Sequence, residues 1–157
     1  MVKQHEDWLK GKPNGRRLVF HDDLFGVDLT GADLRKANLS GANLQDAKLK
    51  GANLSEANLC GTNLSYADLS YADLQYANLR QADLFAADLR HADLCHADLY
   101  RADLGATELQ GSTFRHADLF ASNMYDANMY RANMYDANVT DVAINPGLDR
   151  NRRLVFV

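Results

Sequence analysis

Hydrophobic and polar residues recur along most of the chain with a fixed period of five. Positions 22 to 146 divide into twenty-five consecutive cells of the form Ala-(Asp/Asn)-Leu-x-x, whose positions we number one to five. The third position is Leu in nineteen cells, the first is Ala in eighteen, and the second is Asp or Asn in twenty-one. The exceptions at the second position are Lys48, Glu108, Thr113 and Ala143. A short repeat sustained over this length largely determines the architecture.

A period of five fits neither an α-helix nor a flat strand. In a helix, successive Leu residues would lie about 140° apart and form no apolar stripe. In a strand, side chains alternate with period two, so successive Leu residues would face opposite sides. The chain must therefore bend once per cell, which lets Ala and Leu both point inward. The pattern predicts a solenoid whose coils stack in parallel at about 4.8 Å.

Cells such as ADLRK (32–36), ANLSG (37–41), ADLQY (72–76) and ADLCH (92–96) resemble the pentapeptide-repeat protein family. The resemblance covers 125 of the 157 residues. It implies an all-β fold, a right-handed parallel quadrilateral β-helix with four cells per coil. Twenty-five cells would then form about six coils, a rod roughly 30 Å tall at the usual strand spacing.

Length and composition indicate a single domain built around this solenoid. The column of Leu side chains is an ample core, because each buried Leu contributes roughly 1.5 to 3 kcal/mol. No run of eighteen apolar residues occurs, and residues 1–21 lack a long apolar stretch. We therefore predict a cytoplasmic protein that does not engage a membrane. In that reducing compartment Cys60 and Cys95 are expected to be free thiols.

Two short segments flank the repeat tract of residues 22–146. Residues 1–21 are predicted to form an N-terminal cap, with a helix over residues 1–12, a turn and a strand. Trp8 and Leu9 are expected to lie over the open end of the first coil. Residues 147–157 are predicted to be a C-terminal strand cap or an oligomerisation tail.

The five letters RRLVF occur in both flanking segments, at residues 16–20 and 152–156. In one interpretation each copy covers its own end of the core. In the other, the C-terminal copy adds as a strand to a second molecule and gives a homodimer through a coil end. The candidate oligomerisation strand is Arg152, Arg153, Leu154, Val155 and Phe156.

Charge divides unevenly along the chain. The repeat tract has 18 acidic and 9 basic residues, a net charge of −9, whereas the two flanking segments are basic. With four cells per coil, residues twenty apart stack, and two stacked carboxylates repel by about 0.9 kcal/mol in water. Such ladders serve either solubility or the binding of a basic partner. The candidate partner-binding residues are Asp68, Asp73, Asp83, Asp88, Asp93, Asp98, Asp103, Glu108 and Asp118.

Two further ladders follow from the same stacking. His96 and His116 would stack with Tyr76 and Asp136, near Cys95, which raises a metal-site hypothesis. No spacing of a known zinc site is present, so a structural role is the preferred interpretation. Arg80, Tyr100 and Phe120 would form either a packing strip across coils or part of a protein-binding face.

The sequence contains no nucleophile with an activating base, no Gly-rich phosphate loop and no pair of carboxylates in a pocket. We therefore expect no enzymatic activity, no cofactor and no metal. The main hypothesis is a structural or interaction module that presents a rigid acidic rod to an unknown protein partner. The alternative, implied by the resemblance, is a DNA mimic that binds a basic DNA-binding protein such as gyrase or topoisomerase. Direct nucleic-acid binding is not expected, because the basic residues are split between the two ends.

Overall fold

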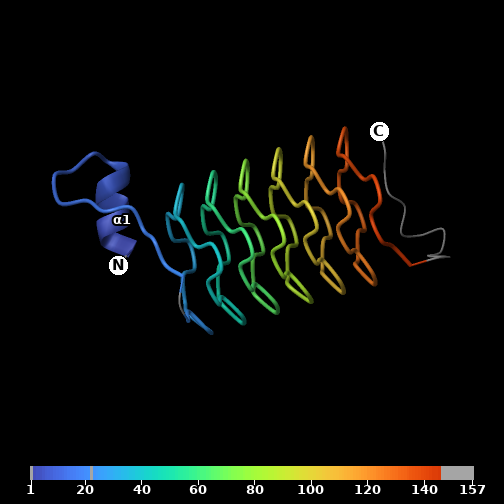
Figure 1. Ribbon diagram of the computed structural model, residues 1–157, viewed down its shortest axis with the longest axis horizontal. Helices are drawn as coiled ribbons and strands as arrows, with labels where there is room; N and C mark the ends of the chain where they lie inside the picture. Colours follow the sequence, from blue (N-terminus) through green and yellow to red (C-terminus); the bar gives the residue numbers. More distant parts are fainter. Residues whose placement is uncertain (1, 22, 146–157) are drawn as a thin grey trace.

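The computed structural model describes residues 2–21 and 23–145. Figure 1 shows one short helix, α1 (Val2–Leu9), followed by a row of stacked coils. Of the 22 parallel β-bridges between described residues, 21 join residues twenty apart, such as Asp73 and Asp93. Twenty residues therefore form one coil. The predicted right-handed parallel quadrilateral β-helix, with four cells per coil, is confirmed.

Neighbouring coils are joined by a regular set of backbone hydrogen bonds. In the middle of the rod, the N–H of Leu74 donates to the carbonyl of Asp93 at 2.7 Å, and the N–H of Asp73 donates to the carbonyl of Ala52 at 3.0 Å. The fifth position contributes a third bond, from Tyr76 to the carbonyl of Cys95 at 3.0 Å. Each cell supplies a single bridged residue, so its strand is very short. Each coil pairs with the coils immediately before and after it, as in other repeat proteins.

The bend in each cell is a turn with a left-handed backbone at the fifth position. Every fifth-position residue from Gly26 to Asp141 has a φ between +54° and +69°. The N–H of the next first-position residue donates to the third-position carbonyl, as from Ala77 to Leu74 at 3.0 Å. This bond, combined with positive φ at the third of the four turn residues, is typical of a type II turn. One such turn per cell produces the four corners of the coil.

The core is a column of third-position side chains faced by small first-position side chains. Third-position residues from Leu34 to Met134 and first-position residues from Ala37 to Ala132 are all buried, which confirms the predicted inward pattern. Buried hydroxyls replace Ala at four first positions, and three of them donate to backbone carbonyls: Thr62, Thr107 and Ser112. The fourth, the Oγ of Ser122, has no hydrogen-bond partner among the described residues.

Helix α1 attaches to the first coil through His5. This side chain is fully buried, whereas Trp8 and Leu9, which we expected to cover the coil end, are only half-buried. The Nδ1 atom of His5 accepts the N–H of Leu18 at 2.9 Å, and Nε2 donates to the carbonyl of Arg35 at 2.9 Å. Burial lowers the pKa of His5. In the described part of the chain, no helix is long and apolar enough to cross a membrane.

The first RRLVF segment is itself part of the first coil. Val19 bridges to Asn38, nineteen residues later, so this side is one residue shorter than its successors. Leu18 is buried in the place of a first-position Ala, and Phe20 packs against the core in the place of a third-position Leu. The second copy, Arg152 to Phe156, lies outside the described residues.

Candidate functional site

Second-position side chains point outward, and each Asp or Asn is anchored to its own turn. In all 21 cells with Asp or Asn, the side-chain Oδ1 accepts the N–H of the residue two positions later. For Asp83 this bond, from Phe85, is 2.9 Å long. Asp and Asn offer the same acceptor, which explains why the position admits both. An Asp also presents a second oxygen to its surroundings.

Asn residues at this position also connect one coil to the preceding coil. In six of them the Nδ2 donates to the Oδ1 twenty residues earlier, at 3.0 Å from Asn58 to Asn38 and at 2.9 Å from Asn123 to Asp103. A carboxylate has no proton to donate in this direction. A ladder of consecutive Asp residues therefore lacks these bonds and adds repulsion between like charges.

The twenty-residue coil assigns every outward residue to one of four sides. We name the side formed by the cells that begin at residues 22, 42, 62, 82, 102, 122 and 142 side 1, and sides 2, 3 and 4 follow it along the chain. The nine predicted carboxylates lie in neighbouring coils on all four sides: Asp83 and Asp103 on side 1, Asp68, Asp88 and Glu108 on side 2, Asp73 and Asp93 on side 3, and Asp98 and Asp118 on side 4. Together they form a belt around the rod.

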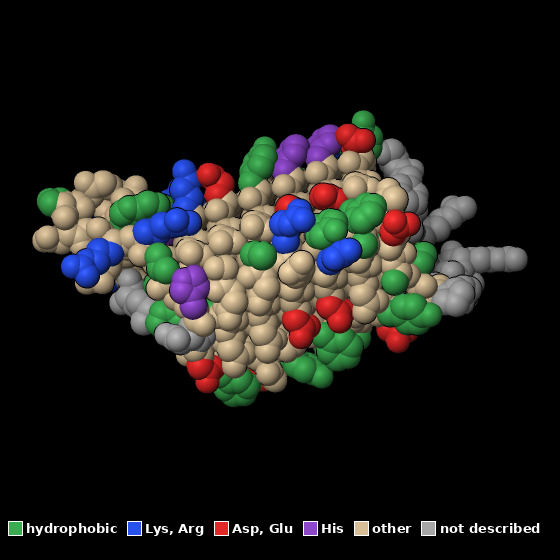
Figure 2. All heavy atoms as spheres, viewed as in Figure 1, with side chains coloured by type: hydrophobic (Ala, Val, Ile, Leu, Met, Phe, Trp, Pro, Cys, Tyr) green, Lys and Arg blue, Asp and Glu red, His purple; other side chains and the backbone are tan. Residues whose placement is uncertain are grey.

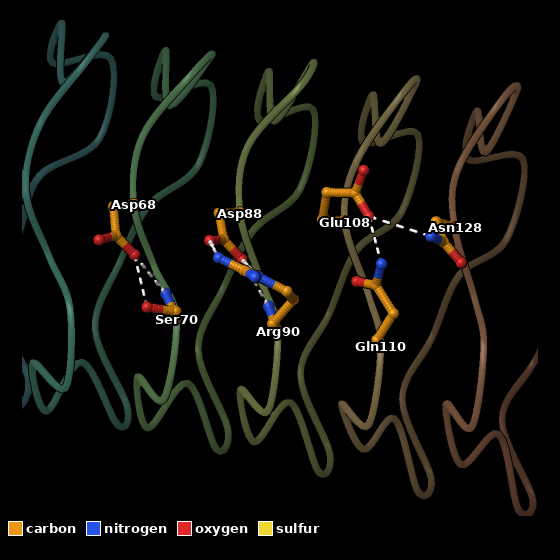
Figure 3. A network of polar contacts seen from close by, with 7 residues as sticks. All are labelled: Asp68, Ser70, Asp88, Arg90, Glu108, Gln110 and Asn128. Carbon is orange, nitrogen blue, oxygen red and sulfur yellow. Dashed lines mark hydrogen bonds and ion pairs between the residues drawn. The ribbon is translucent and has the colours of Figure 1, made fainter.

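Several of these carboxylates are already engaged within the chain. On side 2, shown in Figure 3, the guanidinium of Arg90 binds both oxygens of Asp88. Partial burial opposes ionisation of Asp88, but the hydrogen bonds from Arg90 hold its pKa below the usual value. Asp68 accepts the hydroxyl of Ser70 at 2.6 Å, and Glu108 accepts the amide groups of Gln110 and Asn128. Three second-position carboxylates of side 2 are therefore already hydrogen-bonded within the chain.

Side 1 has a different charge distribution. Its outward positions, the second, fourth and fifth of each cell, hold five acidic residues and no Lys or Arg. The outward positions of sides 2, 3 and 4 hold four, five and three acidic residues together with four, three and two basic residues, respectively. Figure 2 shows acidic and hydrophobic side chains, without Lys or Arg, along the lower edge of the coils. The described acidic residues of side 1 are Asp23, Asp46, Asp83, Asp103 and Asp126.

Exposed aromatic rings accompany the carboxylates of side 1. Phe25, Tyr66, Phe85 and Tyr125 are between 40% and 58% exposed. Tyr66 meets Phe85 edge to face, with ring centroids 5.9 Å apart. Side 1 is thus an acidic surface interspersed with accessible rings. This surface is not evident along the sequence, because its acidic residues belong to different coils and are separated by the charged residues of the other three sides.

The histidine ladder forms a continuous stack of rings. His96 lies 4.7 Å from Tyr76 and 4.8 Å from His116, and the Nδ1 of His116 lies 2.9 Å from an oxygen of Asp136. Burial raises the pKa of the neighbouring Cys95 thiol. Within residues 2–21 and 23–145, no group of three His, Cys, Asp or Glu side chains is arranged to hold a metal ion. The rings of this ladder stack on one another along side 3.

The ladder of Arg80, Tyr100 and Phe120 on side 4 is also stacked. The Arg80 guanidinium lies 4.2 Å from the Tyr100 ring centroid, and the Tyr100 and Phe120 rings are nearly parallel with centroids 5.6 Å apart. Arg80 also forms an ion pair of 3.0 Å with Asp98. One guanidinium therefore contacts the ring and the carboxylate of a single Asp-x-aromatic cell one coil later.

Several solved structures are similar to this chain. HetL, a pentapeptide repeat protein involved in heterocyst differentiation regulation in the cyanobacterium Nostoc sp. strain PCC 7120, is 34% identical over 80% of this chain and 67% of its own, with a TM-score of 0.39. A pentapeptide repeat protein from the Arabidopsis thaliana thylakoid lumen is 27% identical, over 78% and 72%, with a TM-score of 0.44. QnrB1, a plasmid-mediated fluoroquinolone resistance protein, is 16% identical, over 82% and 90%, with a TM-score of 0.47.

No curated protein matches the chain. The family model described as pentapeptide repeats (8 copies) matches residues 23–61, 62–99 and 97–136, which is well over half of the sequence. The match covers the same cells that build the coils. It shows that this chain belongs to the pentapeptide repeat family.

Proposed function

We propose that this protein is a non-enzymatic binding module that presents side 1 of a rigid acidic rod to a basic protein partner. The observation that carries the proposal is the charge of this side, whose outward positions hold five acidic residues and no Lys or Arg. Three of these carboxylates, those of Asp23, Asp83 and Asp103, are anchored to their turns on a densely packed core, so little of their conformational freedom is lost when a partner binds. Electrostatic attraction of this kind accelerates association and selects partners of opposite charge.

A second candidate function is mimicry of DNA toward a DNA-binding enzyme such as gyrase or topoisomerase. Its support is the net charge of −9 on the repeat tract. A DNA duplex carries about 17 charges over the roughly 29 Å that six coils span. The rod has about half that charge, and most of it lies on side 1. The uneven distribution favours a partner that contacts one side over a partner that encloses a duplex.

The test is a comparison of two triple variants with equal loss of charge. Asp46, Asp83 and Asp103 are changed to Asn on side 1, and Asp68, Asp73 and Asp93 are changed to Asn on the next two sides. Binding to a synthetic basic peptide with equal numbers of Arg and Lys is measured at low and high salt. We expect the side 1 variant to lose much more affinity, and binding to weaken with salt. Equal losses in the two variants would contradict the proposal.

Inhibition of gyrase supercoiling separates the two candidate functions. If the protein inhibits gyrase and both triple variants inhibit it equally less, the result would favour the DNA mimic. A site that encloses a DNA duplex would contact the rod from several sides. A cytoplasmic location and the lack of direct nucleic-acid binding remain predictions from the sequence. A homodimer through a coil end also remains a prediction, since residues 152–156 lie outside the described part of the chain.

A further inference from the structure

The rings of Tyr66 and Phe85 lie on side 1 between carboxylates of neighbouring coils. We propose that this patch, formed by Tyr66, Phe85, Asp83 and Asp103, is a docking surface that selects arginine over lysine in a basic segment of a partner protein. The proposal rests on the proposed function of side 1 and adds a chemical preference to it. We name these four residues the arginine patch.

Gly105 allows the Phe85 ring to lie beside the Asp103 carboxylate. A Cβ atom built on Gly105 would lie 3.2 Å from Cδ2 of Phe85 and 3.0 Å from Oδ1 of Asp103. The ring and the carboxylate therefore approach the same point on the surface, where a larger side chain would separate them. Phe85 remains 40% exposed and Tyr66 remains 54% exposed. The patch thus offers an aromatic face and a carboxylate within reach of one guanidinium.

Both carboxylates of the patch keep one oxygen available. The Oδ1 of Asp83 accepts the N–H of Phe85 at 2.9 Å. The Oδ1 of Asp103 accepts the N–H of Gly105 and the Nδ2 of Asn123, both at 2.9 Å. No described residue donates to the Oδ2 atom of either Asp. These bonds fix the orientation of the carboxylates while two oxygens remain free to accept from a partner.

Side 4 shows the same chemistry completed within the chain. Asp98 and Tyr100 occupy the second and fourth positions of their cell, as Asp83 and Phe85 do on side 1. There Arg80, at the fourth position one coil earlier, pairs with Asp98 at 3.0 Å and lies 4.2 Å from the Tyr100 ring centroid. An Asp-x-aromatic cell in this fold therefore accommodates a guanidinium.

On side 1 the place that corresponds to Arg80 is taken by Ser65. Its side chain is small and only 7% exposed, and its hydroxyl donates to Asn63 at 2.6 Å. Arg101, at the adjoining corner, stacks on Tyr100 of side 4 at 5.1 Å. Among the described residues, no cation of the chain itself therefore pairs with the arginine patch. A guanidinium from another protein can take the place that Arg80 takes on side 4.

A guanidinium suits this patch better than an ammonium group. It is planar, stacks on aromatic rings, and can donate to two acceptors at once, whereas the lysine ammonium is a compact and strongly hydrated point charge. Stacking on one exposed ring corresponds to roughly a two- to fivefold gain in affinity per contact. Arginine-rich segments should therefore bind more tightly than lysine-rich segments of equal charge.

The experiment measures the dissociation constants of two fluorescent peptides that differ only in having arginine or lysine at every basic position. Phe85→Leu removes the ring but keeps an apolar side chain, and Tyr130→Leu makes a comparable change on side 2. Ser65→Arg supplies an internal guanidinium at the position of Arg80, and Ser55→Arg adds the same charge on side 3, where the residue one coil later is Gln75. Thermal unfolding of each variant establishes that it is folded.

We expect the wild-type protein to bind the arginine peptide at least twofold more tightly than the lysine peptide. Phe85→Leu and Ser65→Arg should abolish this preference, whereas Tyr130→Leu and Ser55→Arg should retain it. Equal binding of the two peptides, or a preference that survives Phe85→Leu, would overturn the inference and leave the acidic side as the binding surface. Failure of both peptides to bind would overturn the proposed function as well.

Discussion

The backbone N–H of Leu18 donates a 2.9 Å hydrogen bond to Nδ1 of His5, and both residues are buried. The Nδ1 atom can accept this bond only while it carries no proton. The other ring nitrogen donates to the carbonyl of Arg35. The neutral imidazole therefore connects α1 to the first coil at two points, and a protonated ring would lose the contact with Leu18.

The attachment of α1 should depend on pH. Burial lowers the pKa of His5 below its ordinary value of 6.5, so the folded state favours the neutral ring. The stabilisation is complete above pH 6.5 and is lost as the pH falls from there through the lower pKa of the folded state. Fluorescence of Trp8, the single Trp and a stacking neighbour of His5, should report the release of α1. His5→Asn, whose amide oxygen can accept the Leu18 N–H without titrating, should remove the transition. An unchanged midpoint in this variant would contradict the assignment.

Substitutions at the fifth position should change stability in opposite directions. Gly51 and Ala86 both have left-handed backbones, with φ of +63° and +55°. A Cβ atom on Gly51 would meet nothing within 4 Å, so Gly51→Ala tests the backbone alone. We expect Gly51→Ala to lower the free energy of unfolding by about 1 kcal/mol and Ala86→Gly to raise it by a similar amount. Urea unfolding measures both changes. A loss of stability in Ala86→Gly would show that the turn is not strained.

The Asn residues of the last described coil should stabilise the Asp residues one coil before them. Asn123→Asp removes the donor to Asp103 and places two carboxylates about 4.8 Å apart. We expect a loss of about 1 to 2 kcal/mol at low salt, and part of it should disappear at high salt because screening weakens the repulsion. Asn133→Asp is the matched control, since its neighbour one coil earlier is the uncharged Thr113. Equal losses in the two variants would exclude repulsion along the ladder.

Ser122→Ala should make the protein more stable. The hydroxyl of Ser122 is buried without a partner among the described residues, and Ala is the usual residue at this position. Removing an unsatisfied polar group should raise the free energy of unfolding by about 1 kcal/mol. Ser112→Ala is the comparison, because the Ser112 hydroxyl donates to the carbonyl of Leu109 at 2.6 Å. We expect no gain from Ser112→Ala in the same thermal unfolding measurement, and a comparable gain would contradict the explanation.

Much of the fold could be predicted from the period of five. A pattern with Ala at the first position and Leu at the third position of each cell can bury both residues only if the chain bends once per cell. Ala72 and Leu74, for example, are both buried. Six Gly residues at fifth positions were a visible sign of positive φ there. The number of cells per coil came from the family resemblance, because the spacing within one cell does not specify how many corners close a turn. The bridges between residues twenty apart supply that number.

Side-chain directions could not be predicted in the same way. Arg80 contacts Asp98 and Tyr100 one coil later, and Arg90 contacts Asp88 in its own cell, although both residues occupy fourth positions. The second-position residue of its own cell is the neutral Asn78 for Arg80 and the acidic Asp88 for Arg90, so the two arginines reach acidic partners in different coils. His5 was missed because an eight-residue helix has too few apolar positions to identify the docked residue. The acidic side is hidden in the linear sequence because residues of one side recur only once per coil of twenty residues.

Because each cell forms one side of a coil, the length of an insertion determines the direction in which all later sides face. An insertion of twenty residues would add one complete coil and leave the orientation of every later side unchanged. An insertion of five residues would rotate all later sides by a quarter turn. Carboxylates of side 1 that follow the insertion would then point at right angles to those that precede it, and the alignment seen for Asp83 and Asp103 would be lost. Duplications in a gene of this type therefore preserve a continuous binding surface on one side only when they add whole coils.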